Sequence, residues 1–239
     1  MMNYGCLYLI PTPLGDYPPQ EVLTPSVLET VCRLDTFIVE ELRSARRFLS
    51  AAGLKGHIQD LRLAELNEHS TRDEVEALLP LFEGHDVGLI SEAGLPAVAD
   101  PGALAVELCH RHGIKVCPLV GPSSLMLALM GSGLNGQSFA FCGYLPAKTD
   151  QRRNAIRGIE KTSRAMNQTQ IFIETPYRSD AMLADLAQTL SPSTRICIAA
   201  ELTLPGQTIF TMSAADWKKH IADGFQIGKR PCVFLILSQ

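Results

Sequence analysis

Short apolar runs alternate with amphipathic helical stretches along the first half of this chain of 239 residues. Apolar runs of four to eight residues bounded by turn residues are typical of buried strands, and their alternation with helices is typical of parallel sheets. This order predicts an α/β fold in which a mainly parallel sheet is covered by helices on both faces. We expect strands at 6–10, 36–40, 60–66, 86–91 and 115–119, and helices beginning at Pro25 and spanning 43–52, 71–82 and 102–112.

The second half of the chain changes character after an apolar helix expected at 122–133. A hairpin near residues 205–206 indicates antiparallel pairing, so we expect a mixed sheet in an α+β domain. The two domains are therefore expected at 1–119 and 120–239. The expected strands are 138–143, 170–174, 195–201, 207–211 and 231–238, and the expected helices are 150–168, 178–190 and 214–221.

Composition narrows the class of protein. The seven cysteines include no Cys-x-x-Cys pair, which favours buried thiols over disulfides or a zinc site. No apolar run reaches the length of a membrane span, and the chain begins directly with a strand rather than with a signal peptide. We therefore expect a cytoplasmic protein without a membrane partner.

The net charge of −4 excludes a global basic field for nucleic acid. A local basic face stays open, as does the alternative that the same cations are solvated surface. The candidates for such a face are Arg43, Arg46, Arg47, Lys148, Arg152, Arg153 and Arg157.

Two loops that follow expected strands are rich in proline and glycine. Residues 11–16 read Pro-Thr-Pro-Leu-Gly-Asp, in which the prolines stiffen the turn and Gly15 allows a ligand to approach the backbone. Residues 91–102 carry Ser-Glu-Ala-Gly-Leu-Pro and then Asp-Pro-Gly at the end of a buried run. Gly94 can expose backbone groups to a ligand, whereas Asp100 is expected to cap the next helix. For the first loop, a purely rigid connection stays open.

A third loop, at 120–124, reads Val-Gly-Pro-Ser-Ser and leads into a helix. The free amides at a helix N-terminus attract a carboxylate, although capping of the helix by Ser123 would also explain a serine there. Ligands of open α/β sheets bind at the carboxyl ends of the strands, which is where all three loops are expected. The sequence therefore predicts a ligand site built by these loops.

Other motifs can be rejected. The segment 131–136 matches Gly-x-Gly-x-x-Gly, but a helix is expected before it and a strand after it, the reverse of a dinucleotide site. No pair among the six histidines has metal-ligand spacing; His110 and His112, for example, point to different faces of a helix. We expect no metal site.

Taken together, seven segments resemble the tetrapyrrole methylase family, and within it the ribosomal RNA small-subunit methyltransferase I branch. They follow the branch's order along almost the whole chain, which makes the set far more specific than any one motif. The segments are 11–16, 41–49, 91–102, 118–124, 143–148, 174–178 and 200–204.

The resemblance implies a two-domain α/β fold with S-adenosyl-L-methionine held in the cleft, usually in a homodimer. It also implies methylation of a cytidine ribose 2′-hydroxyl in 16S ribosomal RNA, with the RNA or the small subunit as partner. The cofactor-binding residues it implies are Pro13, Gly15, Ser91, Glu92, Ala93, Gly94, Pro96, Gly121, Pro122, Ser123 and Ser124.

Acidic residues at strand ends are the candidates for chemistry at the acceptor. These are Glu174, Glu201 and Glu41, with Glu174 the first choice as a base or an orienting group. Glu174 could instead pair with Arg178 or cap the following helix. The candidates for contact with the substrate are Arg43, Lys148 and Arg178.

The chain departs from the branch mainly on the acceptor side. Leu95, Tyr177 and Leu204 stand where the branch carries Thr, His and Lys. The branch's Asp-Thr-Arg is Glu-Leu-Arg at 41–43, and the Arg before its Glu-Leu-Thr is Ala200. These changes leave two other functions open, a methyltransferase of a tetrapyrrole or other small molecule and a cofactor-binding protein without catalysis.

Overall fold

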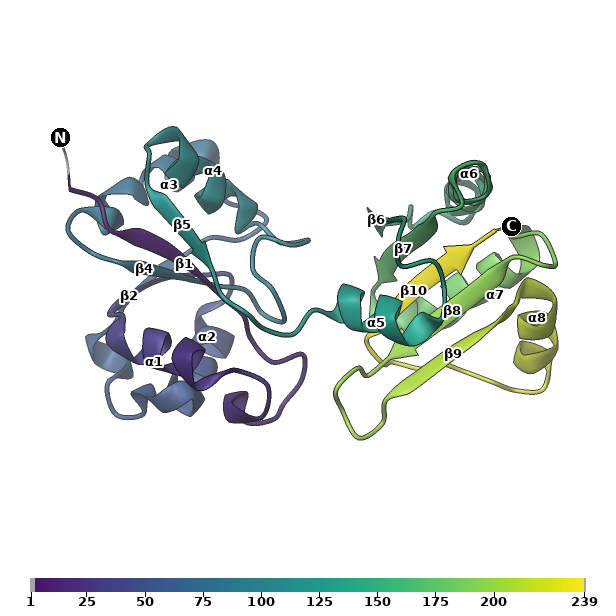
Figure 1. The fold of residues 1–239 in the computed structure, drawn as a ribbon, viewed down its shortest axis with the longest axis horizontal. Coiled ribbons are helices and arrows are strands. Elements are labelled where there is room, and N and C mark those ends of the chain that lie inside the picture. Colours follow the sequence, from purple (N-terminus) through teal and green to yellow (C-terminus); the bar gives the residue numbers. More distant parts are fainter. Residues whose placement is uncertain (1–2, 239) are drawn as a thin grey trace. The chain divides into compact units, whose positions relative to one another are not determined.

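The computed structural model describes residues 3–238, and the chain divides into two compact units (Figure 1). One unit ends at Ser123 and the other begins at Ser124, whereas the sequence-based boundary lies after residue 119. In the described part of the chain no helix is long and apolar enough to cross a membrane.

The first unit consists of strands and helices in alternation. Its elements are β1 (Cys6–Ile10), η1 (Pro19–Glu21), α1 (Pro25–Arg33), β2 (Thr36–Val39), α2 (Leu42–Leu49), η2 (Ser50–Leu54), η3 (Ile58–Asp60), β3 (Arg62–Glu65), α3 (Arg72–Glu76), η4 (Leu79–Phe82), β4 (Val87–Ile90), α4 (Ala103–Arg111) and β5 (Lys115–Pro118).

All strand pairs of the first sheet are parallel, and the strand order is β3-β2-β4-β1-β5. The sheet is buried on both faces because alternate side chains of each strand serve two different cores. Phe37 and Ile90 pack with α1 and α2 on one face, whereas Ile38 and Leu89 pack with α3 and α4 on the other. The predicted parallel sheet with two helical layers is therefore confirmed (Figure 1).

Two expected helices of this unit are shorter than the sequence suggests. The helix expected at 43–52 ends at Leu49 and continues as a single π-turn, in which Gly53 takes a φ of 126°. The helix expected at 71–82 begins as predicted with the Thr71–Glu74 capping box but ends at Glu76. A separate 3-10 turn with Pro80 in its first turn follows, because proline lacks the N–H that would continue an α-helix.

The second unit contains a second sheet and four helices among its described residues. Its elements are α5 (Ser124–Ser132), β6 (Phe139–Tyr144), α6 (Thr149–Met166), β7 (Thr169–Glu174), η5 (Pro176–Arg178), α7 (Ser179–Thr189), β8 (Arg195–Ala200), β9 (Thr208–Ser213), α8 (Ala214–Ala222) and β10 (Cys232–Leu237).

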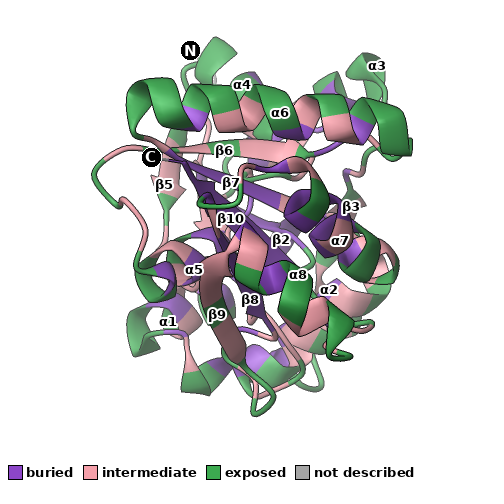
Figure 2. Ribbon diagram, turned by 90° about the vertical axis from the view of Figure 1, so that its right-hand side faces the viewer, coloured by how far each residue is buried: buried purple, intermediate pink, exposed green. Residues whose placement is uncertain are grey.

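This sheet is mixed, as predicted, with the order β6-β7-β10-β8-β9. Strands β6 and β7 are parallel, whereas β10 is antiparallel to both of its neighbours and β8 forms a hairpin with β9. In Figure 2, β10 is buried along its whole length and β9 is mostly intermediate. Phe172 and Phe234 pack with α6, α7 and α8 on one face, and α5 covers the other, where Gly131 lies against Ile209.

The Gly-x-Gly-x-x-Gly match at 131–136 is a helix end and a turn, as the sequence analysis concluded. Helix α5 ends at Ser132, Gly133 takes a φ of 65°, and β6 begins at Phe139. A positive φ directly after a helix is the usual position of a C-terminal glycine cap. The element directly before this segment is helix α5 and not a strand, so the segment is not a dinucleotide loop.

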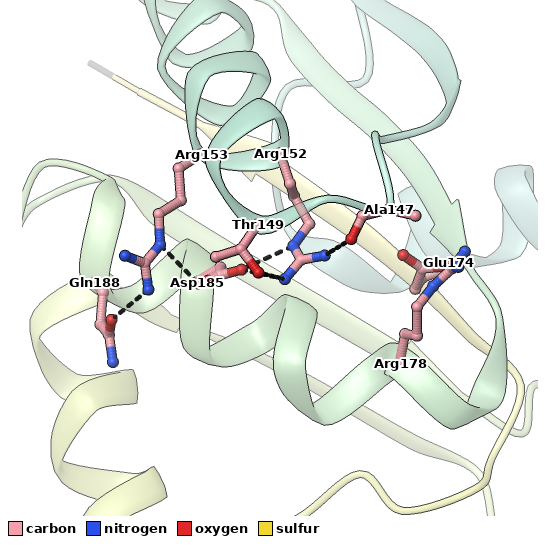
Figure 3. A network of polar contacts seen from close by, with 8 residues as sticks. All are labelled: Ala147, Thr149, Arg152, Arg153, Glu174, Arg178, Asp185 and Gln188. Atoms are coloured by element: carbon pink, nitrogen blue, oxygen red, sulfur yellow. Dashed lines mark hydrogen bonds and ion pairs between the residues drawn. The ribbon is translucent and has the colours of Figure 1, made fainter.

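A buried ion-pair network joins α6 to α7 (Figure 3). The Arg152 and Asp185 side chains are 6% and 7% exposed, and Arg152 Nε donates to Asp185 Oδ2 over 2.7 Å. Arg153 Nε donates to the other carboxylate oxygen over 2.9 Å, and Arg152 also donates to the Ala147 carbonyl over 2.7 Å. The two oxygens of one carboxylate thus hold two guanidinium groups, which gives the network a net positive charge.

Candidate functional site

The loops after β1 and β4 are bonded to each other at the carboxyl edge of the first sheet. Thr12 N donates to Gly94 O over 2.9 Å and Gly94 N donates to Thr12 O over 3.1 Å, an isolated antiparallel bridge. The loops can meet because β1 and β4 are neighbouring parallel strands whose carboxyl ends lie side by side. Gly94 has a φ of 78°, a conformation that a residue with a Cβ rarely takes.

The loop after β5 packs against the same pair of loops. A Cβ added at Gly121 would lie 2.2 Å from Pro11 Cβ, so only a glycine fits the present backbone there. A Cβ at Gly94 would lie 3.5 Å from the Pro122 carbonyl oxygen. The three loops predicted from the sequence are therefore in contact within the first unit, and glycines make the close contacts.

The predicted cofactor residues are distributed over these three loops. Ser91, Gly94 and Pro96 are buried, whereas Glu92 and Ala93 are exposed. Ser124, which lies in the second unit, is the first residue of α5. The partly buried members are Pro13, Gly15, Gly121, Pro122, Ser123 and Ser124.

The loop between β4 and α4 is held in an unusual backbone conformation. Ala97 and Ala99 have φ values of 65° and 63°, in the left-handed region that costs energy for residues other than glycine. Asp100 Oδ1 stabilises this conformation by accepting from Ala97 N over 2.9 Å and from Gly102 N over 2.7 Å. Burial raises the pKa of Asp100, while these backbone N–H groups lower it in part. Such conformations concentrate at functional sites.

Asp100 differs slightly from its expected role. The N-cap residue of α4 is Gly102, which makes no side-chain cap. Asp100 lies two residues earlier, and its carboxylate accepts from the Gly102 N–H. The carboxylate therefore shapes the loop as well as the start of the helix.

Glu40 is a site residue that the sequence analysis did not single out. It follows β2, and its Oε2 accepts from Glu92 N over 3.0 Å, which ties β2 to the loop after β4. Burial raises the pKa of Glu40, the Glu92 N–H lowers it, and the charges of Asp100 and Glu68 raise it further. The sequence signal was available, because Glu40 stands at the carboxyl end of an apolar strand where the other candidates were sought.

We expect Glu40→Ala to weaken cofactor binding about tenfold, because a hydrogen bond to a charged group contributes about 1.5 kcal/mol and the loop depends on it. Glu40→Gln keeps an acceptor oxygen at this position and should restore most of the affinity. Calorimetric titration with S-adenosylhomocysteine measures both. Equal loss in the two variants would show that the charge, and not the hydrogen bond, matters.

Gly121→Ala is expected to weaken cofactor binding and to destabilise the first unit. The new Cβ meets the Pro11 ring, which cannot move without disturbing the Thr12–Gly94 bridge. Gly136→Ala is the matched control, since nothing lies within 4 Å of a Cβ there and its φ is not positive. Similar cofactor affinities in the two variants would contradict a role for the close loop contact.

The acceptor-side candidates of the second unit lie at one edge of its sheet. Strands β6, β7 and β8 run in the same direction, so Lys148, Glu174 and Glu201 follow the same ends of their strands. Cys232 of β10 pairs with both Glu174 and Ala200, which places these two about 10 Å apart, or two strand spacings. The two candidates Glu41 and Arg43 lie in the first unit, at α2.

Glu174 is the most deeply buried of these acids, with a side chain that is 0% exposed. Its Oε1 accepts from Thr175 N over 2.7 Å. Arg178, which lies beside Glu174 in Figure 3, donates to the same oxygen from Nε and Nη2 over 3.0 and 2.6 Å. The pair raises the pKa of Arg178. Glu174 Oε2 is buried and has no hydrogen-bond partner in residues 3–238. A buried carboxylate oxygen without a donor is unusual and fits a ligand that brings one.

Glu201 lies in a turn with strained backbone between β8 and β9. Glu201 and Thr203 have φ values of 50° and 70°, and the Thr203 amide donates to Gln207 Oε1 over 2.9 Å. The Glu201 carboxylate is 3.8 Å from Arg230 Nη1. The Glu-Leu-Thr segment therefore combines two left-handed backbone conformations with an acid near a cation.

Glu41 is the N-cap of α2. Its carboxylate oxygens accept from Arg43 N over 2.8 Å and from Ser44 N over 2.6 Å. These backbone hydrogen bonds lower the pKa of Glu41. A carboxylate that is committed to a helix cap is a poor proton acceptor, so Glu41 is the weakest of the three catalytic candidates.

The first unit's loops fit S-adenosyl-L-methionine. Glycines hold the backbone of these loops where its N–H and C=O groups can meet adenosine and methionine groups. When bound, this cofactor supplies a methyl group on a sulfonium sulfur. The sulfur is a good leaving group because it departs as a neutral thioether. The described residues contain no group of three or more His, Cys, Asp or Glu side chains that could hold a metal.

Comparison with known proteins identifies the family. The model of the tetrapyrrole (corrin/porphyrin) methylases matches residues 6–217. Ribosomal RNA small subunit methyltransferase I of Vibrio cholerae serotype O1 is 32% identical over 231 residues, which cover 96% of this chain and 76% of that protein. The enzyme of the same name from Escherichia coli O157:H7 is 35% identical over 208 residues, 87% of this chain and 68% of that protein.

The fold is shared with solved methyltransferases. The structure of uroporphyrin-III C-methyl transferase from Thermus thermophilus, complexed with S-adenyl homocysteine, superimposes with a TM-score of 0.58 at 17% identity and covers 98% of each chain. The match of the family model and the identity to two methyltransferases agree with the loop geometry described above. The chain belongs to the tetrapyrrole methylase family and is an S-adenosylmethionine-dependent methyltransferase.

Proposed function

We propose that this enzyme methylates ribosomal RNA of the small subunit, at the ribose 2′-hydroxyl of a cytidine. The observation that carries the proposal is the identity of 32% to a ribosomal RNA small subunit methyltransferase over 96% of this chain. The aligned region spans the segments on the acceptor side as well as those of the cofactor loops. The expected homodimer stays a prediction.

Glu174 is the proposed acceptor-side acid. A ribose hydroxyl must lose its proton as its oxygen bonds to the methyl carbon, and a carboxylate oxygen can accept the hydrogen bond and then the proton. Oε1 is occupied by Thr175 and Arg178, so this role is assigned to Oε2, which is buried and has no hydrogen-bond partner within residues 3–238. Arg178 is 40% exposed on its side chain and holds the carboxylate in place.

Three cations are proposed to bind the RNA backbone. Arg43 and Lys148 are exposed, and the Arg178 side chain is 40% exposed while it pairs with Glu174. Phosphate contacts position a nucleic acid without reading its sequence, so they can place a ribose for reaction while base pairing or RNA shape selects the site.

The experiment is a methylation map of 16S ribosomal RNA with and without the gene. Mass spectrometry of nuclease fragments should find one ribose methyl group that is missing in the deletion strain and restored by the purified enzyme with S-adenosylmethionine. The same enzyme incubated with porphyrinoids is the comparison. Methyl transfer to a porphyrinoid and not to RNA would replace the proposal by a small-molecule function, and cofactor binding without transfer to either would indicate an inactive relative.

A further inference from the structure

Helix α2 carries three arginines on one face that have no partner in the described structure. Arg43, Arg46 and Arg47 are exposed, and their side chains make neither hydrogen bonds nor ion pairs within residues 3–238. Residues three and four apart on a helix are neighbours, with Cβ atoms about 5–6 Å apart. The three guanidinium groups therefore form one compact cationic surface, here called the α2 arginine surface.

The helix dipole explains only part of this surface. Arg46 and Arg47 lie in the last turn, where a cation is favourable, whereas Arg43 near the N-terminus opposes the dipole and the like charges repel each other. Residues 41–55 contain four basic residues and one acid, a net charge of +3 in a chain whose total is −4. The one acid, Glu41, is bonded to backbone amides of the helix. Concentrated, unpaired positive charge in an acidic protein favours an anionic ligand.

The α2 arginine surface begins at the edge of the sheet where the cofactor loops lie. Helix α2 starts three residues after the last residue of β2, and Glu40 between them bonds to Glu92 in the loop after β4. Arg43 is in the first turn of the helix and Arg46 and Arg47 are one turn further along, about 5 Å away. An anion bound here would therefore lie beside the loops that hold the methyl donor, within the same unit.

Three arginines of the basic helix α6 in the second unit differ in this respect. Arg152 and Arg153 are committed to Asp185, and Arg164 donates to the Ser191 and Ser238 hydroxyls over 3.1 and 3.2 Å. These cations connect α6 to the rest of its unit. These three arginines of α6 therefore have a structural role, whereas the three arginines of α2 are free for a ligand.

We infer that the α2 arginine surface binds the phosphate backbone of the RNA substrate next to the cofactor loops. This inference rests on the proposed RNA function and adds Arg46 and Arg47 to the substrate contacts. Guanidinium groups form paired hydrogen bonds with phosphate oxygens, and three at this spacing can follow successive phosphates of one strand. The contact is electrostatic, so it contributes affinity and position and not sequence preference.

The test is the salt dependence of RNA binding by the full chain. Binding of an end-labelled 16S ribosomal RNA transcript is measured between low and physiological salt for the unaltered enzyme and for Arg46→Gln/Arg47→Gln. Each lost phosphate contact makes the negative slope of log K against log salt less steep by about 0.7–0.9. The slope of the double variant should therefore be less steep by about 1.4–1.8. Glutamine keeps the helix propensity of arginine, and cofactor affinity serves as the check on folding.

The matched control is Arg157→Gln/Lys161→Gln on α6, which removes the same charge from an exposed part of the second unit. We expect its slope to stay near that of the unaltered enzyme. An unchanged slope in the α2 variant, or an equal loss in both variants, overturns the inference. Arginine-dependent binding without methylation of RNA would overturn the proposed function alone, and absence of RNA binding by the unaltered enzyme would overturn both.

Discussion

Asp185→Ala is expected to lower the free energy of unfolding of the second unit by about 3–5 kcal/mol, the usual cost of breaking a buried ion pair from one side. The Arg152 side chain is 6% exposed and would keep its charge after Asp185 is removed. Its remaining contacts, to the Ala147 carbonyl and the Thr149 hydroxyl, are neutral. An uncompensated guanidinium would thus stay between α6 and α7.

Urea unfolding followed by tryptophan fluorescence measures this effect. The chain has a single tryptophan, Trp217, which is buried in the second unit and donates through its indole N–H to Ile196 O over 2.9 Å. The signal therefore reports the unit that contains the ion pair. The stability change is read from the shift of the midpoint at constant slope.

Two further variants keep this prediction testable. Lys219→Ala removes an ion pair whose side chains are 76% and 57% exposed, and we expect no measurable change. Arg152→Met/Asp185→Leu removes both buried charges and should recover most of the loss, because apolar residues can replace a buried pair. Equal stability of the Asp185→Ala variant and the unaltered enzyme would show that the network contributes little.

Glu174→Gln is expected to lower kcat for methyl transfer by about 100-fold or more, within the range of general acid–base catalysis. Glutamine has the shape of glutamate and its carbonyl oxygen can still accept from Thr175 and Arg178. Its amide nitrogen would then stand where Oε2 is now, and it can only donate. The position would lose the ability to accept a hydrogen bond or a proton from the acceptor hydroxyl.

Single-turnover kinetics with the RNA substrate measure the rate of methyl transfer in this variant. Calorimetry with S-adenosylhomocysteine should show unchanged cofactor affinity. The pH dependence of the rate is the second readout, because removal of a proton acceptor alters the acid limb of the profile and removal of a merely structural contact does not. Glu201→Gln and Glu41→Gln are the comparison variants, with smaller losses expected. If Arg178→Lys reproduces the full defect of Glu174→Gln, the carboxylate acts by orienting Arg178.

The alternation of apolar runs and helices was enough to predict both sheets. Strand β4 lies at Val87–Ile90 where 86–91 was expected, and β7 at Thr169–Glu174 where 170–174 was expected. Short buried strands and helix caps are local signals, which is why they are readable in one sequence. The expected helix at 71–82 was wrong in length because the effect of Pro80 outweighed the apolar periodicity.

The candidate site was predictable only in part. The three cofactor loops stood out because proline and glycine are concentrated after buried strands. Their direct contact through Thr12 and Gly94, and the fit of Gly121 against Pro11, depend on strands that are far apart in sequence. The position of Glu40 at a strand end was readable, but its bond to the loop after β4 was not, since its partner Glu92 lies 52 residues away.

The sequence by itself determined the fold class, the family and the position of the three loops rich in proline and glycine, because each is encoded by periodicity or by motifs that are contiguous in the chain. Only the tertiary structure distinguished between similar charged residues. It commits Glu41 to a helix cap and Asp185 to two arginines. Within residues 3–238 it leaves Glu174 Oε2 and the side chains of the α2 arginines without hydrogen-bond or ion-pair partners. The physical reason is that the role of a charge depends on its burial and its partners, which come from distant parts of the chain.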